Sequence, residues 1–279
     1  MSTGAKQTGH KLGFIGAGTM AEALMKGITA AGVTAPENIL ATDVNLERLS
    51  WLRAEYGIRT EALNARAAEH ADVLLLCVKP QILPQVLCEL GTVVTADQLV
   101  ISIAAGMALP PLERAFDAAV PVVRAMPNTP ALVQRGMTAL AAGTHARAQH
   151  MSIAHELFRG VGSVIEVPEA LMDAVTAVSG SGPAYVFFLM EAMRDAAMRH
   201  GLSDELATHL VVETVRGAGE LIAHTHELPQ ALRQRVTSPG GTTEAAVNVL
   251  QACGVHAALV AAIEAAIARS RALAQGMGT

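Results

Sequence analysis

The chain has 279 residues, more than most single domains, so we expect two domains and a substantial core. A net charge of −5 and only one Trp, two Tyr and five Phe supply neither the basic surface nor the stacking side chains that nucleic-acid binding requires. Hydrophobic residues make up 51% of the chain, but no apolar run reaches the roughly 20 residues of a membrane-spanning helix, so we expect a cytoplasmic protein that buries apolar surface between subunits.

The three cysteines predict a reducing environment. Cys77, Cys88 and Cys253 are too widely spaced to suggest a disulfide framework or a zinc site. Residues 1–10 are polar, without the apolar core of a signal peptide, and we interpret them as a flexible leader. The sequence His-Thr-His-Glu at residues 224–227 has no matching ligand cluster elsewhere, so we expect a solvated helix end there and no metal site.

The first apolar strand, residues 11–15, leads directly into the sequence Gly-Ala-Gly-Thr-Met-Ala at residues 16–21. A helical pattern follows. Gly16 permits a tight turn, Gly18 lets the backbone approach a pyrophosphate, and Ala21 allows the helix and the strand to pack closely. This strand, turn and helix together predict a dinucleotide-binding site.

The second expected strand, residues 38–42, ends at Asp43. A carboxylate in this position pairs with the ribose hydroxyls of NADH and repels the additional phosphate of NADPH. No arginine lies beside it in the sequence, since Arg48 comes five residues later. Asp43 therefore favours NADH, although an acidic residue after a strand also serves as a simple turn or helix cap.

Strands and helices continue to alternate as far as residue 103. We expect helices at residues 46–56, 64–69 and 82–91, an extended piece at 58–60, and strands at 72–78 and 99–103. This alternation predicts an N-terminal Rossmann-type α/β domain, a doubly wound parallel sheet with helices on both faces. Ligands of such sheets bind beyond the carboxyl ends of the strands, so we expect Lys79 and residues 104–106 on the same edge as Gly16 and Gly18. A solvated loop lysine explains Lys79 equally well.

The end of this domain contains a turn with two prolines. The sequence Met-Pro-Asn-Thr-Pro at residues 126–130 predicts a non-helical turn, which suits either a structural turn or an active-site loop. Strands at 138–142 and 163–167 and a helix at 147–159 complete the domain. We therefore expect dinucleotide binding in residues 11–167 and substrate binding and dimerisation in residues 168–279.

From Pro168 onward the strand patterns stop, which predicts an all-α C-terminal dimerisation domain. Helices are expected at residues 169–178, 184–199, 203–223, 229–236, 245–252 and 255–274. Ser181 lacks the preceding strand and the His and Asp partners of a hydrolase nucleophile, so we expect a helix–helix turn around it. The last helix carries a broad apolar face, including Leu259 and Ile263, that is typical of a helical dimer core.

One loop of this domain has the composition of an anion-binding site. It reads Val-Thr-Ser-Pro-Gly-Gly-Thr-Thr-Glu at residues 236–244. Pro239 fixes one φ, Gly240 and Gly241 permit positive φ, and Thr242 or Thr243 can cap the following helix, whose free N–H groups face the loop. A carboxylate is the natural ligand, although an ordinary loop with an N-cap has the same composition.

Several motifs occur in series along the chain. They are Val78-Lys79-Pro80, the Met-Pro-Asn-Thr-Pro turn, Ser-Gly-Ser-Gly-Pro-Ala-Tyr at residues 179–185 and Ser-Pro-Gly-Gly-Thr-Thr at residues 238–243. In this order, behind a dinucleotide-binding domain, they make the chain from Leu12 to about Ala272 resemble the pyrroline-5-carboxylate reductases. The resemblance implies an oxidoreductase that uses NADPH or NADH to reduce the C=N bond of (S)-1-pyrroline-5-carboxylate to L-proline, the last step of proline biosynthesis. It also implies dimers with interlocked C-terminal helices, often assembled into larger rings, in which each active site combines two subunits.

The resemblance also implies which residues line the two binding sites. The cofactor would contact Gly16, Ala17, Gly18, Thr19, Met20, Asn64, Val78, Lys79, Ala104, Ala105 and Gly106, to which we add Asp43. The substrate would contact Glu169, Thr242 and Thr243, with Ser238 and Gly241 in the same loop. We expect the N–H groups of residues 241–243 to hold the substrate carboxylate and the Thr243 hydroxyl, as the catalytic group, to bond the imine nitrogen.

The chemistry of the substrate makes this small set of residues sufficient. A protonated imine is already electrophilic, so positioning and desolvation can supply most of the acceleration without a strong protein acid. Two residues depart from the family pattern and leave the coenzyme open. Asp43 would face the 2′-phosphate of NADPH, whereas Arg235 replaces a smaller polar residue near the cofactor and could reach a phosphate.

Three other functions fit parts of the pattern. A reductase of another small cyclic imine carboxylate would use the same two domains. A β-hydroxyacid reductase ordinarily uses a lysine of its second domain as the acid, but no lysine occurs after Lys79. A non-catalytic sensor of nicotinamide nucleotides would need only the glycine turn and not the loop at residues 236–244.

Overall fold

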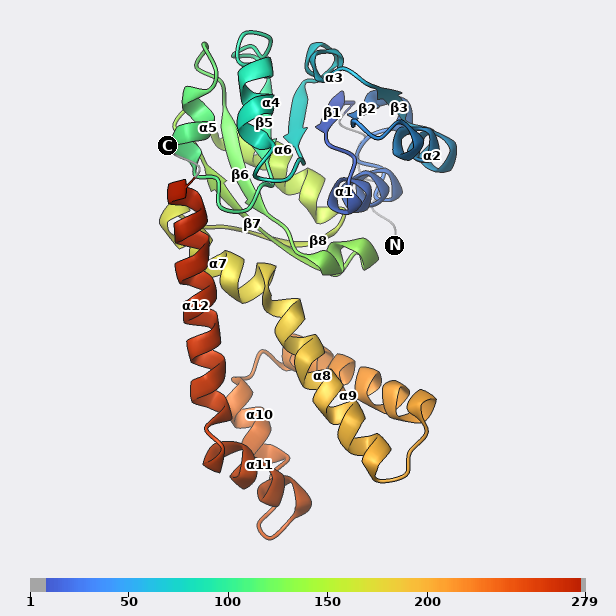
Figure 1. The fold of residues 1–279 in the computed structure, drawn as a ribbon, viewed down its shortest axis with the longest axis vertical. Helices are drawn as coiled ribbons and strands as arrows, with labels where there is room; N and C mark the ends of the chain where they lie inside the picture. Colours follow the sequence, from blue (N-terminus) through green and yellow to red (C-terminus); the bar gives the residue numbers. More distant parts are fainter. Residues whose placement is uncertain (1–8, 277–279) are drawn as a thin grey trace. The chain divides into compact units, whose positions relative to one another are not determined.

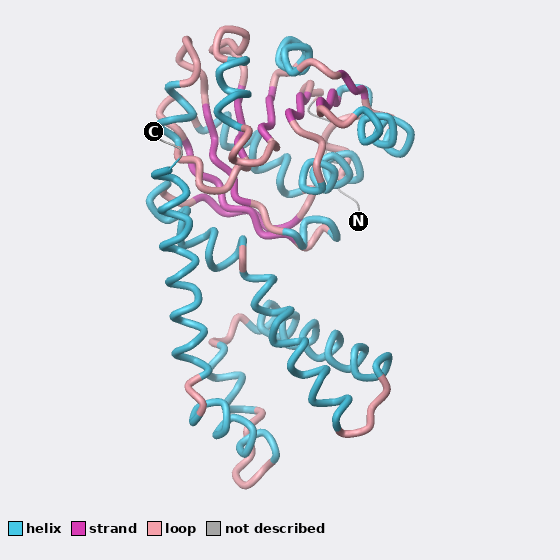
Figure 2. The backbone as a smooth tube through the Cα atoms, viewed as in Figure 1, coloured by secondary structure: helices cyan, strands magenta, loops and turns pink. Residues whose placement is uncertain are grey.

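The computed structural model describes residues 9–276, which form two compact units (Figure 1, Figure 2). The first unit extends to Ser181 and includes the chain from Ala266 onward, and the second is Gly182–Ala265. This division comes later than the predicted boundary at Pro168, because residues 169–181 still belong to the first unit, where Met172 is fully buried. Most of the predicted leader, residues 1–8, lies outside the described residues.

A single eight-stranded sheet forms the centre of the first unit, with the strand order β3-β2-β1-β4-β5-β6-β7-β8. Its strands are β1 (Leu12–Ile15), β2 (Ile39–Thr42), β3 (Arg59–Glu61), β4 (Val73–Leu76), β5 (Leu99–Ser102), β6 (Val122–Met126), β7 (Gly136–Ala142) and β8 (Gly162–Glu166). The first six strands are parallel to one another, as the alternation of strands and helices predicts. The prediction of a Rossmann-type sheet is confirmed for this part of the chain.

The last two strands run in the opposite direction. β7 pairs antiparallel with β6, and β8 is parallel to β7. The chain between β6 and β7 is too short for a crossover helix, which a parallel connection needs. It contains the 3₁₀ helix η2 (Thr129–Val133), so the expected non-helical turn is correct only as far as Asn128, and Pro130 lies in the first helical turn, where no N–H is required.

Helices cover both faces of the sheet and fix two apolar cores. One core lies under α1 (Thr19–Ala30), α2 (Leu46–Tyr56) and α6 (Ala148–Arg159), and the other under α3 (Asn64–His70), α4 (Leu83–Leu90) and α5 (Leu109–Arg114). In β4, Val73 and Leu75 face the first core, while Leu74 and Leu76 face the second. This alternation, with every residue buried, is what a sheet covered on both sides requires.

The chain between the sheet and the second unit is helical throughout but irregular. A 3₁₀ turn (Glu169–Leu171) is followed by α7 (Met172–Val175) and a π-helical turn (Thr176–Gly180). Ser179 therefore lies in a π turn, and only Ser181 separates it from α8 (Gly182–Arg199). The Asn128 side chain accepts a hydrogen bond from the Met137 N–H (2.8 Å) and donates one to the Ser179 carbonyl oxygen (3.0 Å), so the turn after β6 fixes the π turn.

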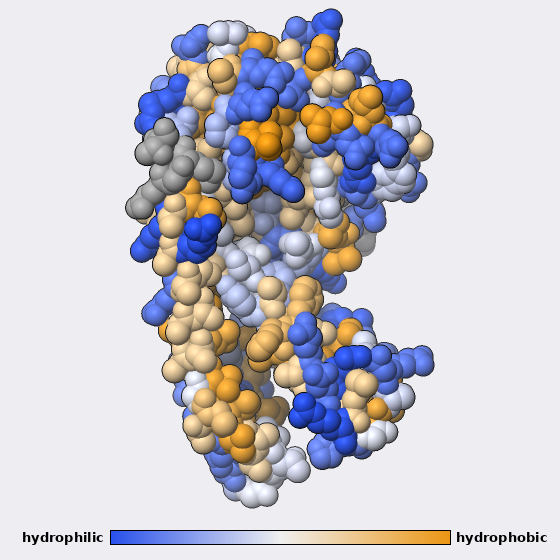
Figure 3. Space-filling view, in the orientation of Figure 1, coloured by the Kyte–Doolittle hydropathy of each residue, from blue (hydrophilic) through white to orange (hydrophobic). Residues whose placement is uncertain are grey.

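The second unit contains α8, α9 (Asp204–Thr225), α10 (Pro229–Arg235) and α11 (Thr242–Ala252), together with the beginning of α12 (Val255–Gly276). The all-α prediction is confirmed for this part of the chain. Ser203 caps α9 as expected, since its side chain accepts a hydrogen bond from the Leu206 N–H. Many large apolar side chains on these helices are exposed, including Phe188 (70%) and Val249 (62%), and apolar surface follows α12 (Figure 3).

Among the described residues, no single helix combines the length and the apolar composition of a membrane span. Helices α11 and α12 meet these two criteria only when they are taken together as a pair bent by 53°.

Close backbone contact holds α1 in place behind the glycine turn. A Cβ atom on Gly27 would lie 2.2 Å from Cγ1 of Val161 and 2.8 Å from the carbonyl oxygen of Gly160. Both distances are below van der Waals contact, so only glycine lets α1 approach the end of α6 this closely.

We predict that Gly27→Ala destabilises the protein although alanine is the better helix former by roughly 1 kcal/mol. Overpacking against Val161 and Gly160 should give a net loss of about 1–3 kcal/mol, measured as a lower midpoint of thermal or urea unfolding. The matched control is Lys26→Ala, because this neighbouring side chain is exposed and its loss should leave the midpoint nearly unchanged. A Gly27→Ala midpoint equal to that of the control would contradict the close contact.

Candidate active site

The glycine turn between β1 and α1 has two distinct glycines. Gly16 has a φ of +93°, and a Cβ atom on it would lie 2.9 Å from the backbone nitrogen of Val78. Gly18 has an ordinary φ of −69°, but a Cβ atom on it would meet nothing within 4 Å. Gly16 is therefore required for the fold, whereas Gly18 leaves open space in front of the helix.

The N-terminus of α1 has free hydrogen-bond donors. Gly18 is its N-cap residue and supplies no side chain to cap the helix. The Glu22 N–H is the first to bond back, to the Gly18 carbonyl oxygen (3.0 Å). Within the described part of the chain, the N–H groups of Thr19, Met20 and Ala21 thus have no protein acceptor, which is the arrangement that binds phosphate.

Three loops meet at the carboxyl ends of β1, β4 and β5. Ile15 pairs with Leu76, and Leu76 pairs with Ser102, so the residues that follow these three strands are neighbours on one edge of the sheet. The structure therefore brings together the predicted residues of these loops, which are Gly16–Met20, Val78 and Lys79, and Ala104, Ala105 and Gly106. Among them the Lys79 residue is exposed, whereas Ala104 is buried.

The other two predicted cofactor residues lie at the end of β2 and at the start of α3. The Asp43 carboxylate accepts hydrogen bonds from the N–H groups of Ala17 (2.8 Å) and Asn45 (2.9 Å), which fixes it beside the glycine turn. The Asn64 amide bonds Thr42 (2.7 Å) through its oxygen and Glu89 (2.9 Å) through its nitrogen. Asn64 thus ties the end of β2 to α3 and α4.

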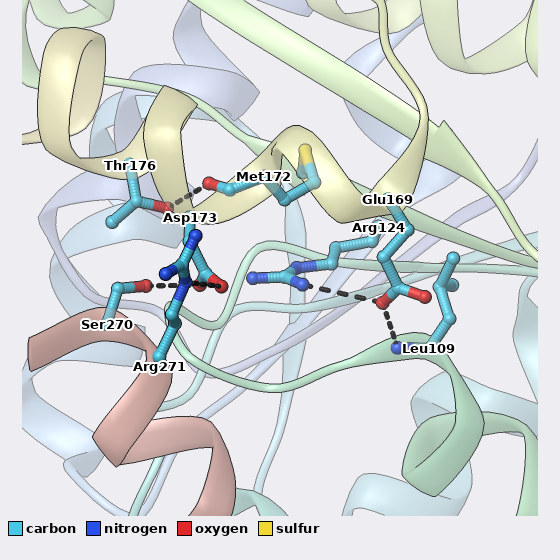
Figure 4. A network of polar contacts seen from close by, with 8 residues as sticks. All are labelled: Leu109, Arg124, Glu169, Met172, Asp173, Thr176, Ser270 and Arg271. Carbon is cyan, nitrogen blue, oxygen red and sulfur yellow. Dashed lines mark hydrogen bonds and ion pairs between the residues drawn. The ribbon is translucent and has the colours of Figure 1, made fainter. Parts of the chain in front are cut away.

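Glu169 belongs to a polar network in the first unit (Figure 4). Its carboxylate accepts a hydrogen bond from the Leu109 N–H, at the start of α5, and lies 3.4 Å from the guanidinium of Arg124. The Arg124 side chain is 94% buried, and the pair therefore links β6 to the loop that follows residues 104–106. Sequence reasoning missed Arg124, although a charged residue inside an otherwise apolar strand indicates a buried partner.

A second group of polar contacts joins α7 to the last turns of α12 (Figure 4). Asp173 accepts a hydrogen bond from the Ser270 hydroxyl (2.7 Å) and lies 3.8 Å from Arg271. Ser270 is only 4% exposed. These contacts explain why the end of α12 belongs to the first unit.

The candidate anion loop lies in the second unit and differs from the prediction in two details. Gly240 has the expected positive φ (+71°), but Gly241 does not (−84°). The Gly241 N–H donates to the Ser238 carbonyl oxygen (3.0 Å) and closes a turn, with Pro239 and Gly240 at its centre. Gly241, rather than a threonine, is the N-cap of α11, and no side chain caps this helix.

This geometry leaves donors free at the start of α11. The Ala245 N–H bonds back to the Gly241 carbonyl oxygen (3.2 Å), so the three N–H groups before it have no acceptor within the described residues. The hydroxyl groups of Thr242 and Thr243 also make no hydrogen bond there. The Glu244 carboxylate accepts the Gly240 N–H (2.8 Å) and holds the loop in this shape.

Arg235, which could have reached a phosphate, is already paired. Its guanidinium donates to the Glu227 carboxylate within the second unit.

A cavity of about 1030 Å³ lies elsewhere in the first unit and contains none of the predicted residues. It is lined by Val33, Ala142 and His155, among others. Ala142 pairs with Val123 near the start of β6, so the cavity is away from the carboxyl ends of the parallel strands. Its position does not suit a ligand of a doubly wound sheet.

The donor set fits a dinucleotide and offers nothing for a metal. The open space at Gly18, the positive φ of Gly16 and the free N–H groups of α1 suit a pyrophosphate. The described residues contain no group of three or more His, Cys, Asp or Glu side chains that could hold an ion.

Comparison with known proteins agrees with this geometry. Residues 169–273 match the model of pyrroline-5-carboxylate reductase dimerisation domains, and residues 11–106 match a family described as NADP oxidoreductase, coenzyme F420-dependent. The pyrroline-5-carboxylate reductase of Methanosarcina acetivorans is 44% identical over 95% of this chain and 98% of its own.

Solved structures give the same result. A pyrroline-5-carboxylate reductase from Coxiella burnetii is 38% identical, with a TM-score of 0.88 over 95% of this chain and 99% of its own. The Plasmodium falciparum pyrroline carboxylate reductase with NADP bound is 30% identical, with a TM-score of 0.88 over 97% of this chain and all of its own. The chain therefore belongs to the pyrroline-5-carboxylate reductase family.

Proposed function

We propose that this chain reduces (S)-1-pyrroline-5-carboxylate to L-proline with a hydride from NADPH or NADH, as the last step of proline biosynthesis. The observation that carries this proposal is a pair of helix N-termini, those of α1 and α11, that glycine N-caps leave with free N–H groups. One suits the pyrophosphate of the cofactor, and the other suits the carboxylate of a small substrate.

On the cofactor side, the glycine turn would hold the pyrophosphate, with residues 16–20 contributing backbone. Val78, Lys79 and residues 104–106 follow the neighbouring strands and would line the rest of the site. The bound cofactor would supply the hydride. In this proposal Glu169 holds the loop after β5 in place, because its carboxylate accepts a hydrogen bond from the Leu109 N–H.

On the substrate side, the N–H groups of Thr242 and Thr243 would hold the carboxylate. The Gly241 N–H is committed to Ser238, so Gly241 contributes as the N-cap and Ser238 as the acceptor that fixes the turn. The Thr243 hydroxyl has no partner in the described part of the chain. Its oxygen would accept a hydrogen bond from the N–H of the protonated imine. Hydride addition to the iminium carbon then gives the neutral amine of proline, and no proton transfer from the protein is required.

The exposed apolar residues of the second unit support self-association. Side chains such as Phe187, Phe188, Leu250 and Val260 are 44–70% exposed in one copy of the chain. Exposed apolar surface of this extent is typical of an interface. We infer a homodimer built on these helices, in agreement with the match to a dimerisation domain.

The reaction itself is tested by the loss of reduced-nicotinamide absorbance with pyrroline-5-carboxylate, using NADPH and NADH in parallel. We expect turnover with the five-membered ring, and the six-membered piperideine carboxylate as a competitor reports the ring size accepted. Binding of both donors without oxidation would support a sensor instead of a reductase.

Thr243→Ala should lower kcat/KM for the imine by roughly one to three orders of magnitude, because the hydroxyl that orients the nitrogen is lost. Thr243→Ser keeps a hydroxyl and should retain most of the activity. Thr225→Ala is the matched control, since the hydroxyl of this threonine bonds only backbone at the end of α9, donating to the Leu221 carbonyl oxygen and accepting the Glu227 N–H. A wild-type rate in Thr243→Ala would rule out the proposed role.

Gly18→Val should leave folding intact but raise the KM for either coenzyme by about tenfold or more, since the new side chain enters the space of the pyrophosphate. We expect the fold to tolerate this side chain, because the φ is −69° and a Cβ atom at this position would meet nothing within 4 Å. The contrasting variant is Gly16→Ala, where positive φ and the contact with Val78 should lower the unfolding midpoint. Unchanged coenzyme KM in a folded Gly18→Val protein would place the pyrophosphate elsewhere.

A further inference from the structure

The end of β2 presents a fixed carboxylate beside the glycine turn. Asp43 accepts the Ala17 N–H through one oxygen (2.8 Å) and the Asn45 N–H through the other (2.9 Å). Each carboxylate oxygen can accept a second hydrogen bond. Asp43 can therefore accept the hydroxyl protons of a ribose without moving.

Arg48 lies close to this carboxylate in the fold but is held by other groups. Its Nε–H donates to the Ala17 carbonyl oxygen (2.8 Å), and its Nη2 lies 2.5 Å from the Glu22 carboxylate. Its guanidinium carbon lies 4.8 Å from the centroid of the Trp51 ring. Both side chains of the ion pair are about four-fifths buried, at 25% and 21% exposure.

Glu22 is itself held as an anion. Burial by itself would raise the pKa of Glu22, but hydrogen bonds from Arg48 and Tyr56 outweigh burial and leave the pKa below its usual value. The Tyr56 hydroxyl donates to Glu22 (2.8 Å), and burial together with this bond raises the pKa of Tyr56 to about 12. At neutral pH the charge of Arg48 is thus offset by a permanent carboxylate.

We propose that Asp43, together with the Glu22–Arg48 ion pair, makes this chain select NADH over NADPH. The inference rests on the proposed binding of the cofactor at the glycine turn. Asp43 and Glu22 carry two negative charges and Arg48 one positive charge, so these three side chains together are net negative. Asp43 is the specificity-determining residue, and Glu22 is a positioning residue that acts through Arg48.

NADH and NADPH differ only at the 2′ position of the adenosine ribose. The ribose of NADH offers hydroxyl protons, which Asp43 accepts. The 2′-phosphate of NADPH carries about −1.5 to −2 charges at neutral pH and offers acceptor oxygens, so it meets Asp43 as a like charge without a proton between them. Arg48 already donates to Ala17 and pairs with Glu22, so the charge it could offer a phosphate is offset by a carboxylate in contact with it.

The test is the ratio of kcat/KM for NADH to that for NADPH, because a ratio within one variant cancels changes in folding or in hydride transfer. In the wild type we expect at least about tenfold in favour of NADH, as expected for a like-charge contact. Asp43→Asn removes the charge and keeps the size, and should move the ratio by about tenfold or more towards NADPH. Glu22→Gln should move it by about three- to tenfold in the same direction, and this gain should vanish in Glu22→Gln/Arg48→Gln.

Glu47→Gln is the matched control, because it removes the same charge from the exposed first turn of α2 and should leave the ratio within about twofold. Direct binding of 2′,5′-ADP and 5′-AMP, measured by titration calorimetry, gives a readout without hydride transfer. In Asp43→Asn the dissociation constant of 2′,5′-ADP should fall about tenfold, and that of 5′-AMP should stay unchanged.

A wild-type preference for NADPH, or a ratio that Asp43→Asn leaves unchanged, overturns the inference while the reductase activity stands. Failure to oxidise either donor with pyrroline-5-carboxylate overturns the proposed function instead. In that case, the two adenosine nucleotides still test the inference, which fails if the wild type binds 2′,5′-ADP as tightly as 5′-AMP.

Discussion

The parallel pairing of β1 with β2 and β4 is the constraint on which the first unit depends. It places the glycine turn, Asp43 and Val78 at one edge, and it fixes their spacing through backbone bonds: the Gly16 N–H donates to the Thr42 carbonyl oxygen (2.9 Å), and the Cys77 N–H donates to the Ile15 carbonyl oxygen (2.8 Å). No side chain can be introduced at Gly16 without displacing the backbone of Val78. Close packing therefore lies directly behind the place where a cofactor would bind, and the open face of Gly18 lies in front of it.

The helices of the two candidate binding sites both start at glycine N-caps. Asn45 and Ser203 cap α2 and α9 with their side chains, each of which satisfies one free N–H of its helix from within the protein. The N-caps of α1 and α11 are Gly18 and Gly241, which have no side chain to offer. Unsatisfied N–H groups at the start of a helix cost free energy unless an anion or water accepts their hydrogen bonds. The free donors of α1 and α11 suit the anionic groups of the two proposed ligands, the pyrophosphate of a dinucleotide and the carboxylate of an amino-acid-like substrate.

Local sequence rules predicted the elements whose boundaries are set locally. Helix α2 begins after the Asn45 cap and ends at Gly57, which has a φ of +68°, and its observed bounds are those predicted. The reversal at β7, the missed helix α5 and the π turn depend instead on contacts between distant segments, as between Asn128 and Ser179. The same holds within the candidate site. The glycine turn could be recognised from its motif, but the Arg124–Glu169 pair joins residues 45 apart in sequence, and the Glu22–Arg48 pair joins two different helices. The predicted threonine cap of α11 was wrong because Pro239 and Gly240 complete a turn that makes Gly241 the cap.

The use of neutral donors in the loop at residues 236–244 follows from the charge of the proposed substrate. A protonated imine and a carboxylate occupy the same small molecule, so a lysine or arginine on the carboxylate would also lie close to the iminium. At a separation of about 5 Å and an effective dielectric constant of 20, that repulsion is roughly 3 kcal/mol. It would lower the pKa of the imine by about two units and deplete the reactive form roughly a hundredfold. Backbone N–H groups and a threonine hydroxyl hold the carboxylate without this cost. The cation nearest in sequence, Arg235, is neutralised by Glu227, and no lysine follows Lys79. The proposed reaction therefore explains why this site is built from dipoles and not from charges.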